Sequence, residues 1–207
     1  MNRAVESWQP PPNIKRLAGV DEVGRGPLAG DVVTAAVILP ADHSIQGLAD
    51  SKALTAYQRE SLYKEIIQQA ICYSVARASV AEIDRFNILQ STLMAMRRAV
   101  RGLEIPPDYV AVDGNRLPQW EYSGEAVVKG DGRVEAISAA SIVAKVVRDA
   151  EMVAMDAKYP GYGFRTNKGY GTAQHLEALK RRGASPIHRR TFSPVRANLE
   201  PQQQSLL

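Results

Sequence analysis

The chain is short of cysteine and of long apolar runs, and each shortage excludes a class of protein. Cys72 is the only cysteine among 207 residues, which excludes an intramolecular disulfide and a metal cluster built from thiolates. The longest apolar runs have the length of a strand, far below the roughly 20 residues that a membrane-spanning helix needs. No apolar signal segment lies near the first residue. We therefore expect a cytoplasmic protein without a membrane span.

Several catalytic motifs are missing as well. The chain has neither the Gly-Lys-Ser/Thr of a phosphate-binding P-loop nor a Gly-x-Ser-x-Gly nucleophile turn. His43, His175 and His188 have neither metal-ligand nor triad spacing, so they are more typical of structural or surface positions. Nucleophilic catalysis therefore has little support.

The composition that is present is typical of one globular domain, with 45% hydrophobic and 23% charged residues. The formal net charge of +4 favours anionic partners, but many proteins without such partners share so mild a balance. Three consecutive prolines predict an irregular lead-in over residues 1–13, and apolar periodicity is lost beyond Pro194. We expect one folded domain over residues 14–198 and a flexible tail over residues 199–207.

Residue periodicity predicts an α/β protein. Strands are expected at residues 16–20, 31–39, 72–78, 109–112 and 125–128. Helices are expected at residues 55–70, 88–102, 136–159 and 172–182. Thr55 and Gln58 form a capping-box pattern, Asn87 follows a helical turn as a plausible N-cap, and the glycine-rich residues 161–172 are typical of a loop. The order of elements predicts a sheet of mixed direction flanked by helices.

Four acidic residues follow three of the predicted strands. Asp21 and Glu22 come after the first strand, and Asp113 and Asp131 come after the last two. Open α/β sheets place their sites at strand ends, so we expect these carboxylates to lie close together. Adjacent residues of a regular strand face opposite sides, however, so the first two can share a site only where the strand ends or bulges.

A cation would stabilise such a group of acids. Two like charges within about 4 Å repel by roughly 1 kcal/mol in water-like surroundings and about 4 kcal/mol at a protein surface. Oxygen ligands without cysteine or a histidine pair favour Mg²⁺ or Mn²⁺ over zinc. The alternative is that Asp113-Gly114 and Asp131-Gly132 are only turn formers, and spacing alone does not exclude it.

The glycine turn, Gly24-Arg25-Gly26, lies directly after the first two acids. It is not a dinucleotide-binding fingerprint, because Gly30 comes four residues after Gly26 and a strand follows where that motif has a helix. Glycines let a backbone approach a ligand closely, and backbone groups can bond a sugar hydroxyl. The alternative is a tight turn with a surface arginine.

Further polar positions could face a ligand. Residues at helical spacing form one polar stripe on the predicted helix 136–159, namely Ser138, Ser141, Lys145 and Asp149. A solvated helix face would have the same pattern. Loops containing Lys52 and Tyr170 have groups suited to phosphate contact and base or sugar stacking.

Seven segments together resemble bacterial type 2 ribonuclease H, the ribonuclease HII family. They are GVDEVGRGPLAG, LADSKAL, AVDGN, VVKGDGR, SAASIVAKVVRDAEM, NKGYGT and HRRTF, in order over residues 17–196. The departures are small: Ala53 stands where a second lysine is common, and Gly132 and Gly171 replace other small or turn residues. None of the departures affects an acid.

The resemblance implies a ribonuclease H-like fold, with a five-stranded mixed sheet flanked by helices and a helical C-terminal extension. It implies that Asp21, Glu22, Asp113 and Asp131 are the catalytic and metal-binding residues, holding two Mg²⁺ or Mn²⁺ ions. One ion would activate water and the other would stabilise the leaving 3′-oxygen, giving 5′-phosphate and 3′-hydroxyl ends. The substrates would be the RNA strand of RNA–DNA hybrids and single ribonucleotides in duplex DNA, cut on the 5′ side.

The same resemblance assigns substrate contacts. The backbone of Gly24, Arg25 and Gly26 would hold the 2′-hydroxyl, and Tyr170 would pack on the following deoxyribose. Phosphate contacts would come from Lys52, Asn87, Ser141 and Lys145. We expect a monomer. Two rivals remain, a catalytically silent module that binds hybrids and a nuclease of the same fold that acts on DNA alone.

The last residues give one expectation about a protein partner. The segment Gln203-Gln204-Ser205-Leu206-Leu207 resembles short Gln-x-Ser-Leu-Leu peptides that dock on the bacterial sliding clamp. The contacts would come from Gln203, Ser205, Leu206 and Leu207, with the leucines as anchors in an apolar groove. The alternative is a disordered end of the chain.

Overall fold

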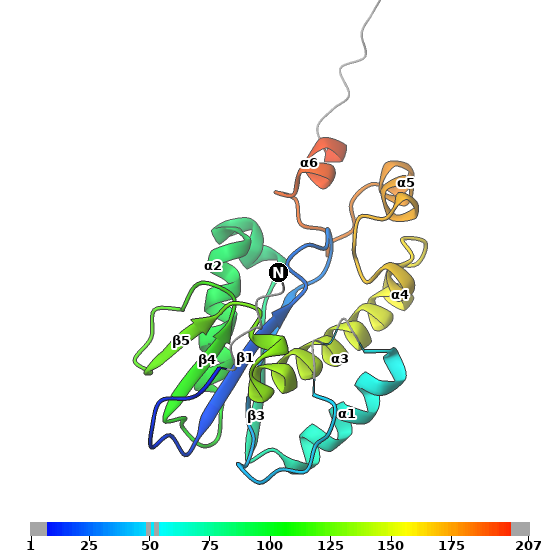
Figure 1. Ribbon diagram of the computed structural model, residues 1–207. Coiled ribbons are helices and arrows are strands. Elements are labelled where there is room, and N and C mark those ends of the chain that lie inside the picture. Colours follow the sequence, from blue (N-terminus) through cyan, green and yellow to red (C-terminus); the bar gives the residue numbers. More distant parts are fainter. Residues whose placement is uncertain (1–7, 49–50, 52–53, 200–207) are drawn as a thin grey trace, which may run out of the picture.

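A five-stranded mixed sheet forms the centre of the molecule (Figure 1). The computed structural model describes residues 8–48, 51 and 54–199. The strands are β1 (Leu17–Val23), β2 (Val32–Ile38), β3 (Cys72–Ala78), β4 (Tyr109–Asp113) and β5 (Gly124–Val127). Their order is β3-β2-β1-β4-β5. Strand β2 pairs antiparallel with β1 and β3, and β4 pairs parallel with β1 and β5. The predicted mixed sheet is therefore confirmed.

Helices cover both faces of the sheet. They are α1 (Ala56–Gln69), α2 (Val80–Arg101), α3 (Glu135–Lys158), α4 (Phe164–Asn167), α5 (Ala173–Arg182) and α6 (Ser193–Leu199), with a 3₁₀ turn, η1 (Gly130–Gly132). Alternate residues of β2 pack in opposite directions: Val33, Ala35 and Val37 face α1 and α3, whereas Ala36 and Ile38 face α2. Burial on both faces explains why β2 is apolar at every position except Thr34.

Local signals predicted the long elements well. The capping box of Thr55 and Gln58 opens α1. Asn87 interrupts α2 with φ 66°, and its side-chain oxygen accepts from the N–H groups of Leu89 and Gln90, as expected of an N-cap. The short helices α4 and α6 lie where the sequence predicted no helix, because four and seven residues are too few to show a helical period.

One glycine lets α3 lie directly against β1. A Cβ atom at Gly19 would come within 2.0 Å of the backbone of Ala136. The first turns of α3 consequently pack beside Asp21, two residues further along β1. This contact determines which side chains surround the acids.

Some predictions fall partly outside the described residues. The division into a lead-in, a domain over residues 14–198 and a tail stays a prediction, because residues 1–7 and 200–207 are not described. Within the described ranges, no helix has the length and apolar character needed to cross a bilayer.

Candidate active site

The strand β1 carries two of the four acids. It extends to Val23, so the prediction that the strand ends before Asp21 was wrong; pairing with β2 continues through Glu22↔Thr34 and Val23↔Val33. Asp21 is buried, and its Oδ1 accepts from the backbone N–H of Glu22 at 2.7 Å. The chain is thus regular at the point where the two acids follow one another.

Strand alternation places the two neighbours on different faces. Ala18 and Val20 pack in the apolar cluster of α2, so Asp21 faces α3 and Glu22 points to the opposite side. The Glu22 carboxylate lies 3.4 Å from the guanidinium of Arg25. Asp21 and Glu22 therefore do not start from the same face.

The end of β4 brings Asp113 next to Asp21. The two strands are parallel with Val20 opposite Val112, and each acid is the following residue. Asp113 Oδ1 accepts from the backbone N–H groups of Gly130 at 2.7 Å and of Asp131 at 3.4 Å. The turn η1 thus orients the Asp113 carboxylate and carries Asp131 beside it.

Electrostatic interactions join three of the acids. Burial raises the pKa of Asp21 well above its ordinary value, and the charges of Glu22 and Asp113 raise it further. Burial also raises the pKa of Glu22; Arg25 opposes this shift, and the charge of Asp113 adds to it. The carboxyl groups of Asp21 and Glu22 are therefore harder to ionise in the absence of a cation.

The oxygen donors fit a hard divalent cation, although they are not assembled as a finished metal centre. No three Asp, Glu, His or Cys side chains of the described residues form a ready metal-binding group. A cation held by Asp21 and Asp113 would remove the repulsion that raises the pKa of Asp21.

The polar stripe of α3 faces the acids over its first turns. Ser138 and Ser141 are buried, so the alternative of a solvated helix face is wrong for both. Ser138 Oγ donates to the carbonyl of Asp131 at 2.6 Å, and a hydrogen bond from Ser141 favours the charged form of Asp21. Ser141 Oγ also lies 2.8 Å from Ser51 Oγ.

Two of the other residues expected to contact phosphate, Lys145 and Asn87, have bonding partners other than the four acids. Lys145 Nζ lies 2.8 Å from the carboxylate of Asp149, one turn along α3. Asn87 is exposed, and its side-chain oxygen is used in capping α2. Lys52 lies outside the described residues.

A buried arginine holds the glycine turn from below. Arg189 is fully buried, and its guanidinium donates to four backbone carbonyls, those of Gly24, Arg25, Pro27 and Gly30. Burial, with a smaller contribution from the charge of Arg148, lowers the pKa of Arg189 to about 9, so it stays protonated at neutral pH. The turn is therefore pre-formed, with its carbonyls directed inward.

A second buried arginine, Arg148 of α3, joins the glycine turn to the loop of Tyr170. It donates to the carbonyls of Ala29, Asp31 and Lys168. Gly24 has φ +94°, and a Cβ atom there would come within 2.1 Å of Arg148 Nε. We call Arg148 and Arg189 the arginine brace. Sequence reasoning missed both, because a basic cluster near His188 and one arginine beside the α3 stripe are typical of surfaces.

Tyr170 lies beside the glycine turn. Its ring carbon Cε1 is 3.5 Å from the position of a Cβ atom at Gly26, and the side chain is 43% exposed. The backbone N–H of Leu28 donates to the carbonyl of Gly169 at 2.8 Å. The structure thus brings together the two elements expected to contact the sugar.

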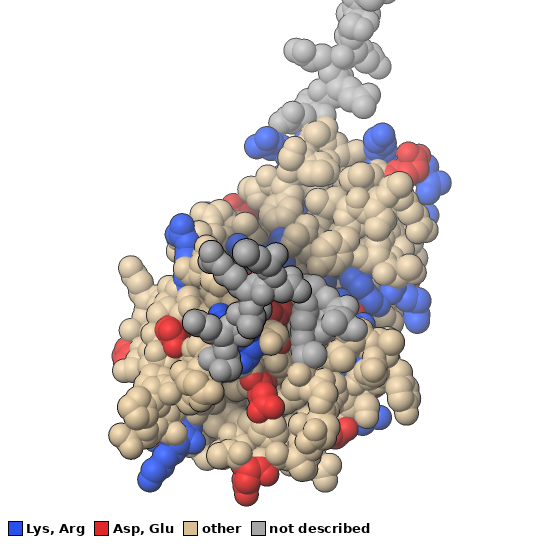
Figure 2. Space-filling view, viewed as in Figure 1, with Lys and Arg blue, Asp and Glu red and all other residues tan. Residues whose placement is uncertain are grey.

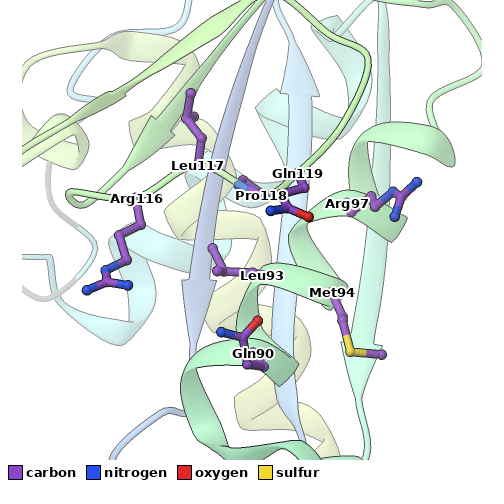
Figure 3. A pocket seen from close by; sticks show the side chains of 8 residues that line it. All are labelled: Gln90, Leu93, Met94, Arg97, Arg116, Leu117, Pro118 and Gln119. Carbon is purple, nitrogen blue, oxygen red and sulfur yellow. The ribbon is translucent and has the colours of Figure 1, made fainter.

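A separate cavity of about 540 Å³ lies between α2 and the loop after β4. Figure 3 shows Arg97 and Arg116 on opposite sides of it, with Leu93 and Gln90 between them. None of the four acids lines this cavity. The acids lie instead at or near the carboxyl ends of β1, β4 and β5.

Positive charge gathers on the C-terminal helices. Figure 2 shows Lys and Arg side chains around α4 and α5, where α5 ends on Lys180, Arg181 and Arg182. Such groups attract the phosphates of a nucleic acid irrespective of sequence.

Comparison with known proteins identifies close relatives. A family model described as Ribonuclease HII matches residues 18–195. The ribonuclease HII of Albidiferax ferrireducens is 61% identical over 179 residues, which is 86% of each chain. That of Paracidovorax citrulli is 58% identical over 193 residues, covering 93% of this chain and 79% of the relative. The crystal structure of ribonuclease H2 from Pyrococcus horikoshii OT3 matches with a TM-score of 0.74 and 32% identity, over 88% of this chain and 96% of that chain.

Proposed function

The chain belongs to the ribonuclease HII family, and on that premise we propose that it cuts RNA–DNA hybrids and also incises duplex DNA 5′ of single embedded ribonucleotides. One observation supports the proposal most directly. The mutually repelling acids Asp21 and Asp113 lie at the sheet edge from which the glycine turn follows, and Tyr170 lies against that turn. The acids that we expect to hold metal ions for hydrolysis therefore lie beside the residues that we expect to contact the sugar.

We propose that four acids hold two divalent ions, Mg²⁺ or Mn²⁺, during the reaction. They are Asp21, Glu22, Asp113 and Asp131. When bound, the ions supply activation of the attacking water and stabilisation of the leaving 3′-oxygen, which gives 5′-phosphate and 3′-hydroxyl ends. Asp21 and Asp113 start from one face of the sheet, so Glu22 has to turn towards them to share an ion.

The surrounding residues orient these acids. The N–H groups of η1 hold the Asp113 carboxylate, and Ser138 holds the backbone of Asp131. Fixed partners of this kind keep carboxylates directed at a shared ligand. We assign phosphate contacts to Lys52, Asn87, Ser141 and Lys145, of which Lys145 must exchange its contact with Asp149 for the substrate.

We assign the recognition of ribose to the glycine turn and Tyr170. The absence of a side chain at Gly26 lets the backbone approach the 2′-hydroxyl, and the absence of one at Gly24 makes room for Arg148 beneath the turn. The Tyr170 ring, next to Gly26, then packs on the following deoxyribose. Because the brace points the turn's carbonyls inward, the N–H groups of residues 24–26 are the groups we expect to meet the sugar.

Three labelled substrates of one base sequence test this function: an RNA–DNA hybrid, a duplex with one ribonucleotide, and an all-deoxy duplex. With Mg²⁺ or Mn²⁺, we expect cleavage of the first two and none of the third. Cutting the all-deoxy duplex equally well would support the rival nuclease that acts on DNA alone. Binding of the hybrid without cleavage under any divalent ion would support the silent binding module.

A second proposal concerns a protein partner and the cell compartment. We propose that Gln203, Ser205, Leu206 and Leu207 dock the enzyme, as a cytoplasmic monomer, on the bacterial sliding clamp. These residues lie outside the described part of the chain, so the support is the peptide pattern alone. Removing residues 203–207 should abolish retention on immobilised clamp while cleavage of short hybrids is unchanged. Unchanged retention would refute the docking.

A further inference from the structure

Two buried histidines connect the C-terminal segment to Tyr170. His175 and His188 are 0% and 1% exposed, and their Nε2 atoms lie 3.0 Å apart. His175 Nδ1 lies 2.8 Å from the carbonyl oxygen of Tyr170. At the other end, His188 Nδ1 lies 2.9 Å from the backbone nitrogen and 2.8 Å from the hydroxyl oxygen of Ser185. An unbroken chain of hydrogen bonds therefore runs from Ser185 to Tyr170.

The partners at the two ends assign every proton in this chain. A backbone N–H can only donate, so His188 Nδ1 is an acceptor and the proton of neutral His188 is on Nε2. A carbonyl can only accept, so His175 carries its proton on Nδ1 and accepts with Nε2. The two assignments agree, because His188 Nε2–H then donates to His175 Nε2. Neutral rings satisfy all four nitrogen atoms, whereas an added proton would place two N–H groups against each other.

The backbone around His188 is paired with the segment that directly follows the glycine turn. Residues 28–30 pair with residues 187–189: Arg189 N–H donates to the carbonyl of Leu28, and Gly30 N–H donates to that of Ile187. The Arg189 side chain holds the carbonyls of the turn. Two neighbouring residues thus hold the two sides of the sugar site. Arg189 holds the glycine turn, and His188 holds the Tyr170 backbone through His175.

We propose that His175 and His188 are positioning residues that set the place of Tyr170 relative to the glycine turn, and thereby the preference for single ribonucleotides over long hybrid RNA. The inference rests on the proposed role of Tyr170. A polar pair that merely stabilised the core would end on any buried backbone group. This chain ends on the carbonyl of the residue whose ring lies against Gly26.

The test compares two substitutions that differ only in hydrogen bonding. In His188→Gln, the side-chain amide can accept from Ser185 and donate to His175. In His188→Leu, the side chain has no group that can form either hydrogen bond. The measurement is kcat/KM for the single-ribonucleotide duplex and for the long hybrid. We expect His188→Leu to lower the ratio of the two values about tenfold and His188→Gln to keep it within about twofold.

A matched control comes from the same cluster. Tyr162 packs its ring 5.0 Å from that of His188, and its hydroxyl donates to the carbonyl of Gly183. Tyr162→Phe removes one buried hydrogen bond without touching the chain to Tyr170, so it should lower stability and leave the ratio unchanged. If His188→Leu does not fold, His188→Asn serves instead, because the shorter amide stays near Ser185 and does not reach His175.

Tyr170→Ala separates failure of this inference from failure of the proposed function. We expect Tyr170→Ala to lower the ratio, and His188→Leu to have no further effect on the ratio in that background. If Tyr170→Ala leaves the ratio unchanged, the role of Tyr170 is wrong and the inference falls with it. If Tyr170→Ala lowers the ratio and His188→Leu alone lowers both activities equally, the histidines are only structural and the inference alone is overturned.

Discussion

At the carboxyl ends of the neighbouring strands β1 and β4, the buried Asp21 lies beside another acid, whereas under the glycine turn the buried Arg189 faces backbone carbonyls. Both side chains are removed from water. Burial raises the pKa of Asp21 and lowers the pKa of Arg189, and each shift favours the neutral form of the side chain. Their partners differ in kind. Asp113 adds a like charge to Asp21, while Gly24, Arg25, Pro27 and Gly30 together satisfy the Arg189 guanidinium.

This difference separates the part that needs a ligand from the part that needs none. Acids that repel one another are stabilised when a cation binds, so we expect the site at the ends of β1 and β4 to be completed only by metal and substrate. A guanidinium bonded to dipoles of the backbone is complete without a ligand. We therefore expect substitutions at the acids to affect activity, and substitutions in the arginine brace to affect stability first.

The largest expected effect is at Asp113. Asp113→Asn should lower cleavage of the hybrid by more than about 100-fold, since even residues that only support metal ligands commonly cost about 10–100-fold. The protein should still fold and bind duplex. The control is Asp108→Asn at the other end of the same strand region, where the carboxylate pairs with Arg16. Equal losses in both variants, or full activity in Asp113→Asn, would show that the acids do not form the site.

The brace should give the opposite result. Arg189→Met leaves four buried carbonyls without their donor, and we expect it to lower the free energy of unfolding by about 3 kcal/mol or more. Chemical denaturation measures this loss. Its neighbour Arg190 is exposed, so Arg190→Met should change the free energy by less than about 0.5 kcal/mol. A stable but inactive Arg189→Met would mean that the brace serves catalysis rather than folding.

The histidine chain predicts how stability depends on pH. Burial, with help from the nearby His175, lowers the pKa of His188 to about 4. The unfolded chain therefore binds this proton first, and stability is lost as pH falls from about 6.5 to about 4. Between pH 7.5 and 5, we expect His188 to account for about 2 kcal/mol of lost stability. The loss should be correspondingly smaller in His188→Gln, and an identical pH profile would contradict the burial of a neutral ring.

Substitutions at the two glycines of the turn should have different effects on stability. The smallest loss of stability is expected at Gly26. A methyl group at Gly26 meets only the Tyr170 ring at 3.5 Å, so Gly26→Ala should unfold at nearly the wild-type temperature. We expect it to lower cleavage about tenfold by obstructing the sugar. Gly24→Ala, with φ +94° and a contact of 2.1 Å, should lose both stability and activity. Full activity of Gly26→Ala would exclude a close approach of the sugar at that position.

The sequence allowed the sheet, the long helices and the placing of acids at strand ends to be predicted, because each has a short-range pattern. The apolar, β-branched run of β2, the capping box at Thr55 and the polar step from Ser138 to Ser141 are examples. What failed depends on contacts between distant segments. The end of β1 is set by its pairing with β2 rather than by its own residues. Arg148 and Arg189 look like surface arginines until loops from elsewhere in the chain close over them.

The bonds of Arg189 reach across 159 to 165 residues of the chain, which has a consequence for synthesis. Chains fold from the N-terminus as they emerge, and contacts this distant form last. A nascent chain that has passed Asp131 already holds all four acids, but its glycine turn has no support from Arg189 until that residue has left the ribosome. The turn that we propose to select the sugar is therefore finished well after the acids that we propose to cut the strand.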